Sequence, residues 1–310
     1  MLQAPEGAAE AAHSAAERFN AGETIIGHVA NSPEPLIHLP PIAGIDLSIT
    51  KHVLMLWIAA VVVCTVATLI VRRYARDGQM VPKGPVMGLF EYVIVRIRDE
   101  IVAPTVGRKW VNTYTPLIAS FFLFIVTANA IGLIPIFDLL ALLNHTVFHF
   151  PEEAFFTRLT HGGVTPTGNF NVTAALATIS FVAIIVAGTR AHGFFGHWKN
   201  LIPHGIHPAL WVILIPIEIL GMFVRPFALT MRLAANMTGG HIAVLAVLSM
   251  IFIMAESTRN ALVGLGMSVV ALPLSVGVSL LEAAVVVPVQ AFVFTLLTAV
   301  FVGMAIHAHH

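Results

Sequence analysis

Charged residues and cysteine are both scarce in this 310-residue chain. Only 10% of the residues are charged and 57% are hydrophobic, whereas a typical soluble domain is roughly 25% charged. This depletion excludes an ordinary soluble domain and predicts an integral membrane protein. Sixteen basic and sixteen acidic residues cancel, which argues against a nucleic-acid partner. The single cysteine, Cys64, permits no internal disulfide bond.

The first 45 residues lack the basic start and the apolar core of a signal peptide. Residues 8–18 are rich in Ala and Glu and favour a short exposed helix, and four prolines between positions 33 and 41 indicate an extended linker. We therefore divide the chain into an exposed N-terminal tail, residues 1–45, and a membrane domain, residues 46–310.

Long apolar runs make up most of the remaining sequence. A helix needs about 20 apolar residues to cross a hydrocarbon core of ~30 Å. Three runs have that length, and two are much longer, so each of these two is either one strongly tilted helix or two short spans. Taken together, the two runs give four short spans or two tilted helices; both numbers are even, so the C-terminus lies on the same side of the membrane in both alternatives. The runs are residues 52–71, 113–136, 170–189, 206–255 and 260–306.

The distribution of Lys and Arg predicts the orientation. The connection formed by residues 72–111 carries eight of them, whereas residues 137–169 carry only Arg158. Because cytoplasmic loops are enriched in basic residues, we expect the first connection inside the cell and the second outside. The N-terminus then lies outside and the C-terminus in the cytoplasm.

Residues 86–102, inside the basic connection, are too charged to span a membrane. Their apolar residues recur around one face, which predicts an amphipathic helix on the membrane surface. A helix packed against a soluble partner is the alternative interpretation.

Three charged side chains recur every seven residues in the fourth apolar run: Glu218, Arg225 and Arg232. Seven residues are nearly two helical turns, so the three share one stripe. Glu218 could neutralise Arg225 structurally, but no acidic residue lies three or four positions from Arg232. A charge at bilayer depth costs ~3 kcal/mol or more, so we expect a functional role for Arg232.

Two further ionisable residues lie in these runs. His241 is nine residues beyond Arg232, on the opposite side of an ideal helix, where it could serve as a proton relay or as a packing residue. Glu282 has no helical partner on the last run. Glu256 and Arg259 flank the break between the two long runs and suit a solvated outer turn.

Several segments, in order, resemble subunit a of the rotary F-type ATP synthase. They are "FIVTANAIGLIPI" (124–136), "TPTGNFNVTAALA" (165–177), "RPFALTMRLAANMTGGH" (225–241) and "EAAVVVPVQAFVFTLLTAVFVG" (282–303). The resemblance implies an all-α membrane protein with five transmembrane helices and one amphipathic surface helix, the last two spans being long and strongly tilted. It implies a ring of c subunits, peripheral-stalk b subunits and the remaining ATP synthase as partners in a bacterial inner membrane. It implies neither a cofactor nor a metal site, and no catalytic activity of the chain on its own.

The resemblance also implies roles for individual residues. Arg232 takes the position of the family's essential arginine, which faces the carboxylate of each passing c subunit. The proton pathway would include Gln290, Asn236, the pair of His241 and Glu282 in the outer half-channel, Asn169 near its mouth and Glu218 in the inner half-channel.

The spacing between Glu282 and Gln290 departs from the family pattern. It is eight residues rather than seven, and eight steps turn the carboxylate by about 100° away from the expected face. A π-bulge or a distortion at Pro288 would absorb the extra residue.

Two interpretations from other classes compete with the stator subunit. A secondary transporter would show internal repeats or paired broken helices, but the pattern of residues 218–241 occurs once. An intramembrane enzyme could bind a metal through His192, His197, His204 and His207, but these histidines do not form a His-Glu-x-x-His pattern. We therefore favour an ion-translocating stator subunit, with a transporter as the alternative.

Overall fold

The computed structural model describes residues 20–22, 25, 26, 48–77, 84–133, 165–199 and 211–307, without the side chains of residues 74–77. In these ranges the regular structure is helical, and five helices are long and apolar enough to cross a membrane. This confirms the predicted fold class. Most of the tail, residues 1–45, lies outside the described ranges.

The first three apolar helices lie where the composition predicts them. α3 covers Lys51–Asp77, α6 covers Val111–Leu133 and α9 covers Phe170–His192. The backbone N–H of Asn171 donates to the Asn169 side chain at 2.8 Å, which caps the first turn of α9. Residues 134–136, the expected end of the second span, lie outside the described ranges.

Each of the two longest apolar runs forms one long helix. α11 covers Trp211–Ser257, and the next helix runs from residue 261 to residue 306. This second run consists of α12 (Ala261–Leu281), a π-helical segment (Glu282–Val286) and α13 (Val287–Ile306). The 47 residues of α11 reach about 70 Å, more than twice a ~30 Å hydrocarbon core, so α11 must lie strongly tilted to remain inside it.

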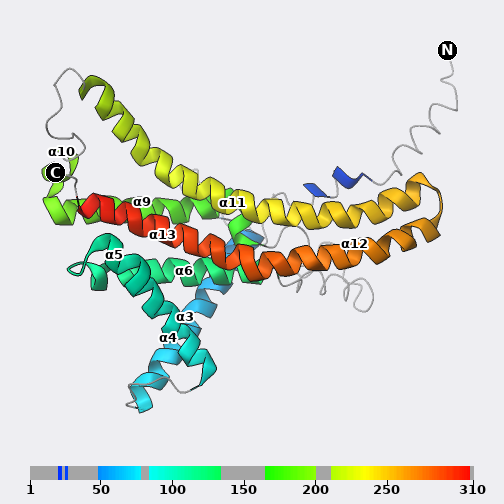
Figure 1. The fold of residues 1–310 in the computed structure, drawn as a ribbon, viewed down its shortest axis with the longest axis horizontal. Helices are drawn as coiled ribbons and strands as arrows, with labels where there is room; N and C mark the ends of the chain where they lie inside the picture. Colours follow the sequence, from blue (N-terminus) through cyan, green and yellow to red (C-terminus); the bar gives the residue numbers. More distant parts are fainter. Residues whose placement is uncertain are drawn as a thin grey trace.

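α11 and α12 form a hairpin whose turn lies at one end of the molecule (Figure 1). The Asn260 side chain accepts a hydrogen bond from the backbone N–H of Leu262 at 3.0 Å and so caps α12. Glu256 and Arg259 are exposed at this turn, in agreement with the solvated break expected there.

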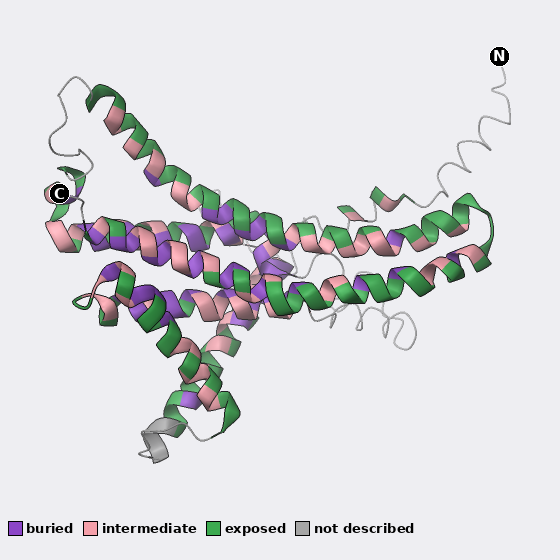
Figure 2. Ribbon diagram, in the orientation of Figure 1, coloured by how far each residue is buried: buried purple, intermediate pink, exposed green. Residues whose placement is uncertain are grey.

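The core lies where α6, α9, α13 and the middle of α11 meet. Leu229 and Leu233 of α11 are buried there, and the rings of Phe121 and Phe294 are 5.5 Å apart between their centroids. Figure 2 shows the buried residues concentrated in this region, while α12 and the two ends of α11 are mostly exposed. The middle of α11 is therefore held firmly, and its other face remains open.

The predicted surface helix is helical and packs partly on this chain. It consists of α4 (Pro85–Arg96), a π-helical segment (Ile97–Val102) and α5 (Ala103–Val106). α4 has no buried residues, whereas apolar side chains of the following two segments enter a core cluster with α6, α9 and α13. The charged side chains Arg96 and Glu100 form an exposed ion pair.

Candidate functional site

Arg232 lies in the middle of α11 on its exposed face. Its neighbours Leu229 and Leu233 are buried, which directs the arginine away from the core. Within the described residues, no ion pair or hydrogen bond involves its guanidinium. The adjacent positions on this face, one turn away in each direction, are Ala228 and Ala235, and both are exposed. Small side chains leave room for another helix to approach the guanidinium closely.

Arg225 lies on the same helix but has partners. Its Nη2 is 3.3 Å from Oε1 of Glu218, and its guanidinium carbon lies 5.4 Å from the centre of the Phe301 ring on α13. The ion pair is partly exposed, so its contribution is modest, about 1 kcal/mol or less. The contact with Phe301 links α11 to α13. These contacts give Arg225 and Glu218 the structural role that the sequence left open.

A second link between α11 and α13 lies one turn from Arg232. Nδ2 of Asn236 donates to Oε1 of Gln290 at 2.7 Å. Gln290 is only 4% exposed, whereas Asn236 is exposed, so this hydrogen bond is half-buried. The two amides therefore fix α13 against the segment of α11 that carries the arginine.

A π-helical segment begins at Glu282 and ends at Val286. A π-bulge accommodates one extra residue within a helix, so the eight-residue interval from Glu282 to Gln290 spans the same two turns as seven residues of α-helix. Both side chains are buried and both face α11, where Glu282 contacts Gly240 and Gln290 contacts Asn236. The extra residue is thus absorbed by the π-bulge.

The carboxylate of Glu282 is buried without a hydrogen-bond partner in the described part of the chain. The residue is 3% exposed, and both of its oxygens lack a partner. It packs so closely against Gly240 that a Cβ atom at that position would overlap the carboxylate. Because buried polar groups are almost always paired, an unpaired carboxyl group is a candidate for binding a proton, an ion or water.

His241 follows Gly240 and contacts a different partner. Its Nε2 forms a hydrogen bond with the hydroxyl group of Thr165. No hydrogen bond joins His241 to Glu282 in the described residues; Glu282 packs against Gly240, the residue before His241. The expected pair is therefore brought into one neighbourhood without a hydrogen bond between the two side chains.

Polar side chains from three helical segments surround this neighbourhood, and several were not singled out in the sequence. The hydroxyl group of Thr167 donates to Oδ1 of Asn129, and both residues are fully buried. The hydroxyl group of Thr238 on α11 donates to the backbone oxygen of Gly168 at 3.4 Å. An asparagine within the apolar run of α6 was the available signal, because a buried amide requires partners.

Asn169 lies at the start of α9 beside these residues. Its side-chain oxygen caps the helix, and the residue is buried. The capping contact explains its presence structurally, and no hydrogen bond joins it to Glu282 in the described residues.

The histidines of the competing metal-enzyme interpretation lie at the other end of α9. His192 ends α9, and His197 lies on α10 (Phe194–Lys199). Burial, and secondarily the charge of nearby His192, lowers the pKa of the His197 imidazole. The described residues contain no group of three or more potential metal ligands, and His204 and His207 lie outside them.

Comparison with known proteins identifies the family that this chain resembles over most of its length. The family model described as ATP synthase A chain matches residues 53–303. ATP synthase subunit a of Chlorobium phaeobacteroides is 37% identical over 99% of this chain and 81% of its own length. The subunit a proteins of Pelodictyon phaeoclathratiforme and Myxococcus xanthus are each 36% identical, over 96% and 86% of this chain and 79% and 75% of their own lengths.

The family match includes most or all of each of the five apolar helices, and the relative from Pelodictyon phaeoclathratiforme matches along 96% of the chain. The matched region contains Arg232, the hydrogen-bonded side chains of Asn236 and Gln290, and the buried Glu282. The chain therefore belongs to the ATP synthase subunit a family.

Proposed function

We propose that this chain is the ion-translocating stator subunit of a rotary ATP synthase, in which Arg232 faces the carboxylates of a rotating ring of c subunits. The observation that carries the proposal is a permanently charged guanidinium that is exposed and unpaired among the described residues, in the middle of an apolar helix. Folding alone gives no reason to retain it, because a charge at bilayer depth is costly. A carboxylate on a partner subunit would supply the missing counter-charge.

Arg232 acts by electrostatics. A nearby cation favours the ionised form of a carboxyl group, so each ring carboxyl group releases its proton as it passes Arg232. The proton leaves through one half-channel and is replaced from the other. Arginine suits this task because its guanidinium stays charged even in surroundings where lysine loses its proton. The fixed charge also prevents protons from crossing directly between the half-channels.

The outer half-channel runs past Glu282 and His241. Glu282 is the proton-binding group, supported by its burial without a partner and by its contact with Gly240, next to His241. Thr165 positions the His241 imidazole. The buried pair of Asn129 and Thr167 continues the polar lining, and Asn169 lies at its mouth.

The inner half-channel lies on the other side of Arg232 along α11. Glu218 precedes Arg232 by fourteen residues, about 21 Å along a helix, and is partly exposed. It provides the acidic group of this pathway while also pairing with Arg225. Asn236 and Gln290 hold α13 beside Arg232 and keep the two pathways apart.

The same proposal covers the position of the chain in the cell. Residues 46–310 form the membrane domain in a bacterial inner membrane, with the N-terminal tail outside and the C-terminus in the cytoplasm. The segment of residues 86–102 lies on the cytoplasmic membrane surface. The partners are the lipid bilayer, the c ring, the peripheral-stalk b subunits and the remaining ATP synthase. The chain is a non-catalytic subunit of that complex.

The test is ATP-driven proton pumping by the complete complex in vesicles. Arg232→Ala should abolish pumping while the subunit still assembles, and Arg232→Lys should restore little because a flexible ammonium group lacks the planar donor geometry. Arg225→Ala is the matched control, seven residues away on the same helix, and should reduce pumping only mildly. Normal pumping by the Arg232→Ala complex would overturn the proposal.

A further inference from the structure

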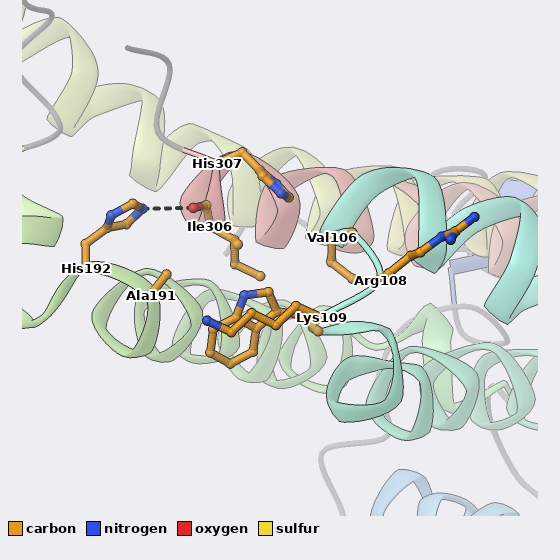
Figure 3. Close-up of a pocket in the computed structure, with 9 residues that line it drawn as sticks. Val106, Arg108, Lys109, Ala191, His192, Ile306 and His307 are labelled. Atoms are coloured by element: carbon orange, nitrogen blue, oxygen red, sulfur yellow. Dashed lines mark hydrogen bonds between the residues drawn. The ribbon is translucent and has the colours of Figure 1, made fainter.

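A cavity of about 350 Å³ opens where the start of α6 meets the ends of α9 and α13 (Figure 3). This volume is within the range of small-ligand sites. Nine residues line the cavity; four are Arg, Lys or His, and none is acidic. None of the lining residues belongs to the proposed proton pathway.

The side chains of Lys109 and His192 face each other across this cavity. Figure 3 shows the Lys109 side chain extending toward the end of α9, where His192 lies, whereas Arg108 points the other way. Nε2 of His192 donates to the backbone oxygen of Ile306 at 2.8 Å, which fixes the imidazole ring. The second ring nitrogen of His192 is then available to a ligand when the ring is protonated.

A backbone turn forms one wall of the cavity. Gly107 has a φ of 79°, which a glycine adopts readily, and its carbonyl oxygen accepts hydrogen bonds from the N–H groups of Trp110 and Val111 at the start of α6. His307 lies against Gly107 and completes this wall of the cavity.

Aromatic side chains indicate the depth at which the cavity opens. Nζ of Lys109 lies 5.4 Å from the centre of the Trp110 ring. Beyond His192, α10 carries an aromatic cluster in which Phe195 is 85% exposed and the Phe194 ring contacts Trp198. Tryptophan is enriched at the level of lipid headgroups, so Trp110 and Trp198 suit this end of the molecule to the membrane interface.

We propose that this cavity is an anion site that binds a phosphate group through Lys109, His192 and His307. Basic pockets between transmembrane helices on the cytoplasmic side bind phospholipid headgroups, and the exposed aromatic cluster favours that source over free phosphate. The positive charges, the missing carboxylates and the fixed imidazole all match a phosphate anion. A bound headgroup would link the start of α6 to the ends of α9 and α13.

Binding is measured on the full-length chain in detergent by native mass spectrometry. Added phosphatidylglycerol should appear as one retained adduct, and Lys109→Gln should weaken its binding about tenfold. Lys109 is exposed, so this substitution leaves the packing intact. Lys199→Gln is the matched control, because Lys199 is an exposed lysine on α10 that does not line the cavity.

Inorganic phosphate, titrated into the delipidated chain, separates the two sources. Lipid binding that depends on Lys109 supports a headgroup site, and phosphate binding that depends on Lys109 without lipid binding supports the same anion site with a free ligand. If Lys109→Gln and Lys109→Gln/His192→Gln bind both ligands as tightly as the unmodified chain, the proposal is wrong.

Discussion

Arg225 and Arg232 differ in their surroundings although they lie on one helix seven residues apart. Arg225 has an ion pair with Glu218 and an aromatic contact with Phe301. Arg232 has neither among the described residues. The sequence marks both arginines as unusual, because a charged side chain in an apolar run costs free energy inside a membrane. Only the structure shows that one is satisfied inside the chain and the other faces outward.

The contact between Gly240 and Glu282 gives a prediction at the scale of a single atom. Gly240→Ala should displace the buried carboxylate, because the added Cβ would overlap it, and overpacking of this kind costs about 1–3 kcal/mol. We expect ATP-driven pumping by the complex to fall several-fold. Gly221→Ala, on the same helix with open space around its Cβ position, should leave pumping unchanged. Equal pumping by the two variants would show that the contact between Gly240 and Glu282 is not needed for proton transfer.

The π-helical segment Glu282–Val286 determines which side chains of the last helix face α11. The eight-residue spacing to Gln290 signals a distortion in the sequence, but it does not distinguish a bulge from a kink at Pro288. The structure has the bulge, which ends at Val286, two residues before Pro288, and the helix continues through Pro288 to residue 306.

Deleting one residue tests this account of the bulge. Removal of Ala284 should convert the segment to regular α-helix with a seven-residue spacing, leaving Glu282 and Gln290 facing α11. Assembly and pumping should be largely retained. Removal of Val276, which lies in regular α-helix on α12, should instead rotate one half of the helix by about 100° and abolish pumping. Loss of pumping in both deletions would mean that the extra residue is required in its own right.

Other contacts in the candidate site could not be read from local sequence. Thr165 and His241 are 76 residues apart, and Asn129 and Thr167 are 38 residues apart. Helical periodicity reports which residues share a face of one helix, but it contains no information about the neighbouring helix. By contrast, the apolar runs predicted the spans closely, because membrane thickness sets their minimum length.

At the scale of the whole molecule, two helices of 47 and 46 residues are too long for perpendicular spans. Length and composition left two short spans or one tilted helix per run equally possible, since four spans and two spans both place the C-terminus on the same side of the membrane. Continuous helices from residue 211 to 257 and from 261 to 306 decide between them, while residues 206–210 lie outside the described part of the chain. The open face of α11 is therefore a long surface along which a partner can lie.

The proposed orientation can be measured with single cysteines in a Cys64→Ser background. A cysteine in place of Thr258, at the turn between α11 and α12, should react with a membrane-impermeant maleimide added outside the cell. A cysteine in place of Lys199, on α10, should react with the same reagent only after the membrane is permeabilised. Both positions are exposed, so accessibility reports the side of the membrane. Labelling of both from the same side would contradict the orientation.

The central claim is that the fixed charge of Arg232 separates two half-channels. Its most direct test is passive proton flux through vesicles that contain the membrane sector without the soluble ATPase. The account predicts that Arg232→Ala loses coupled pumping yet conducts protons at least as fast as the unmodified sector, because the barrier between the half-channels is gone. A variant that retains normal coupled pumping with no added leak would show that Arg232 is a structural residue.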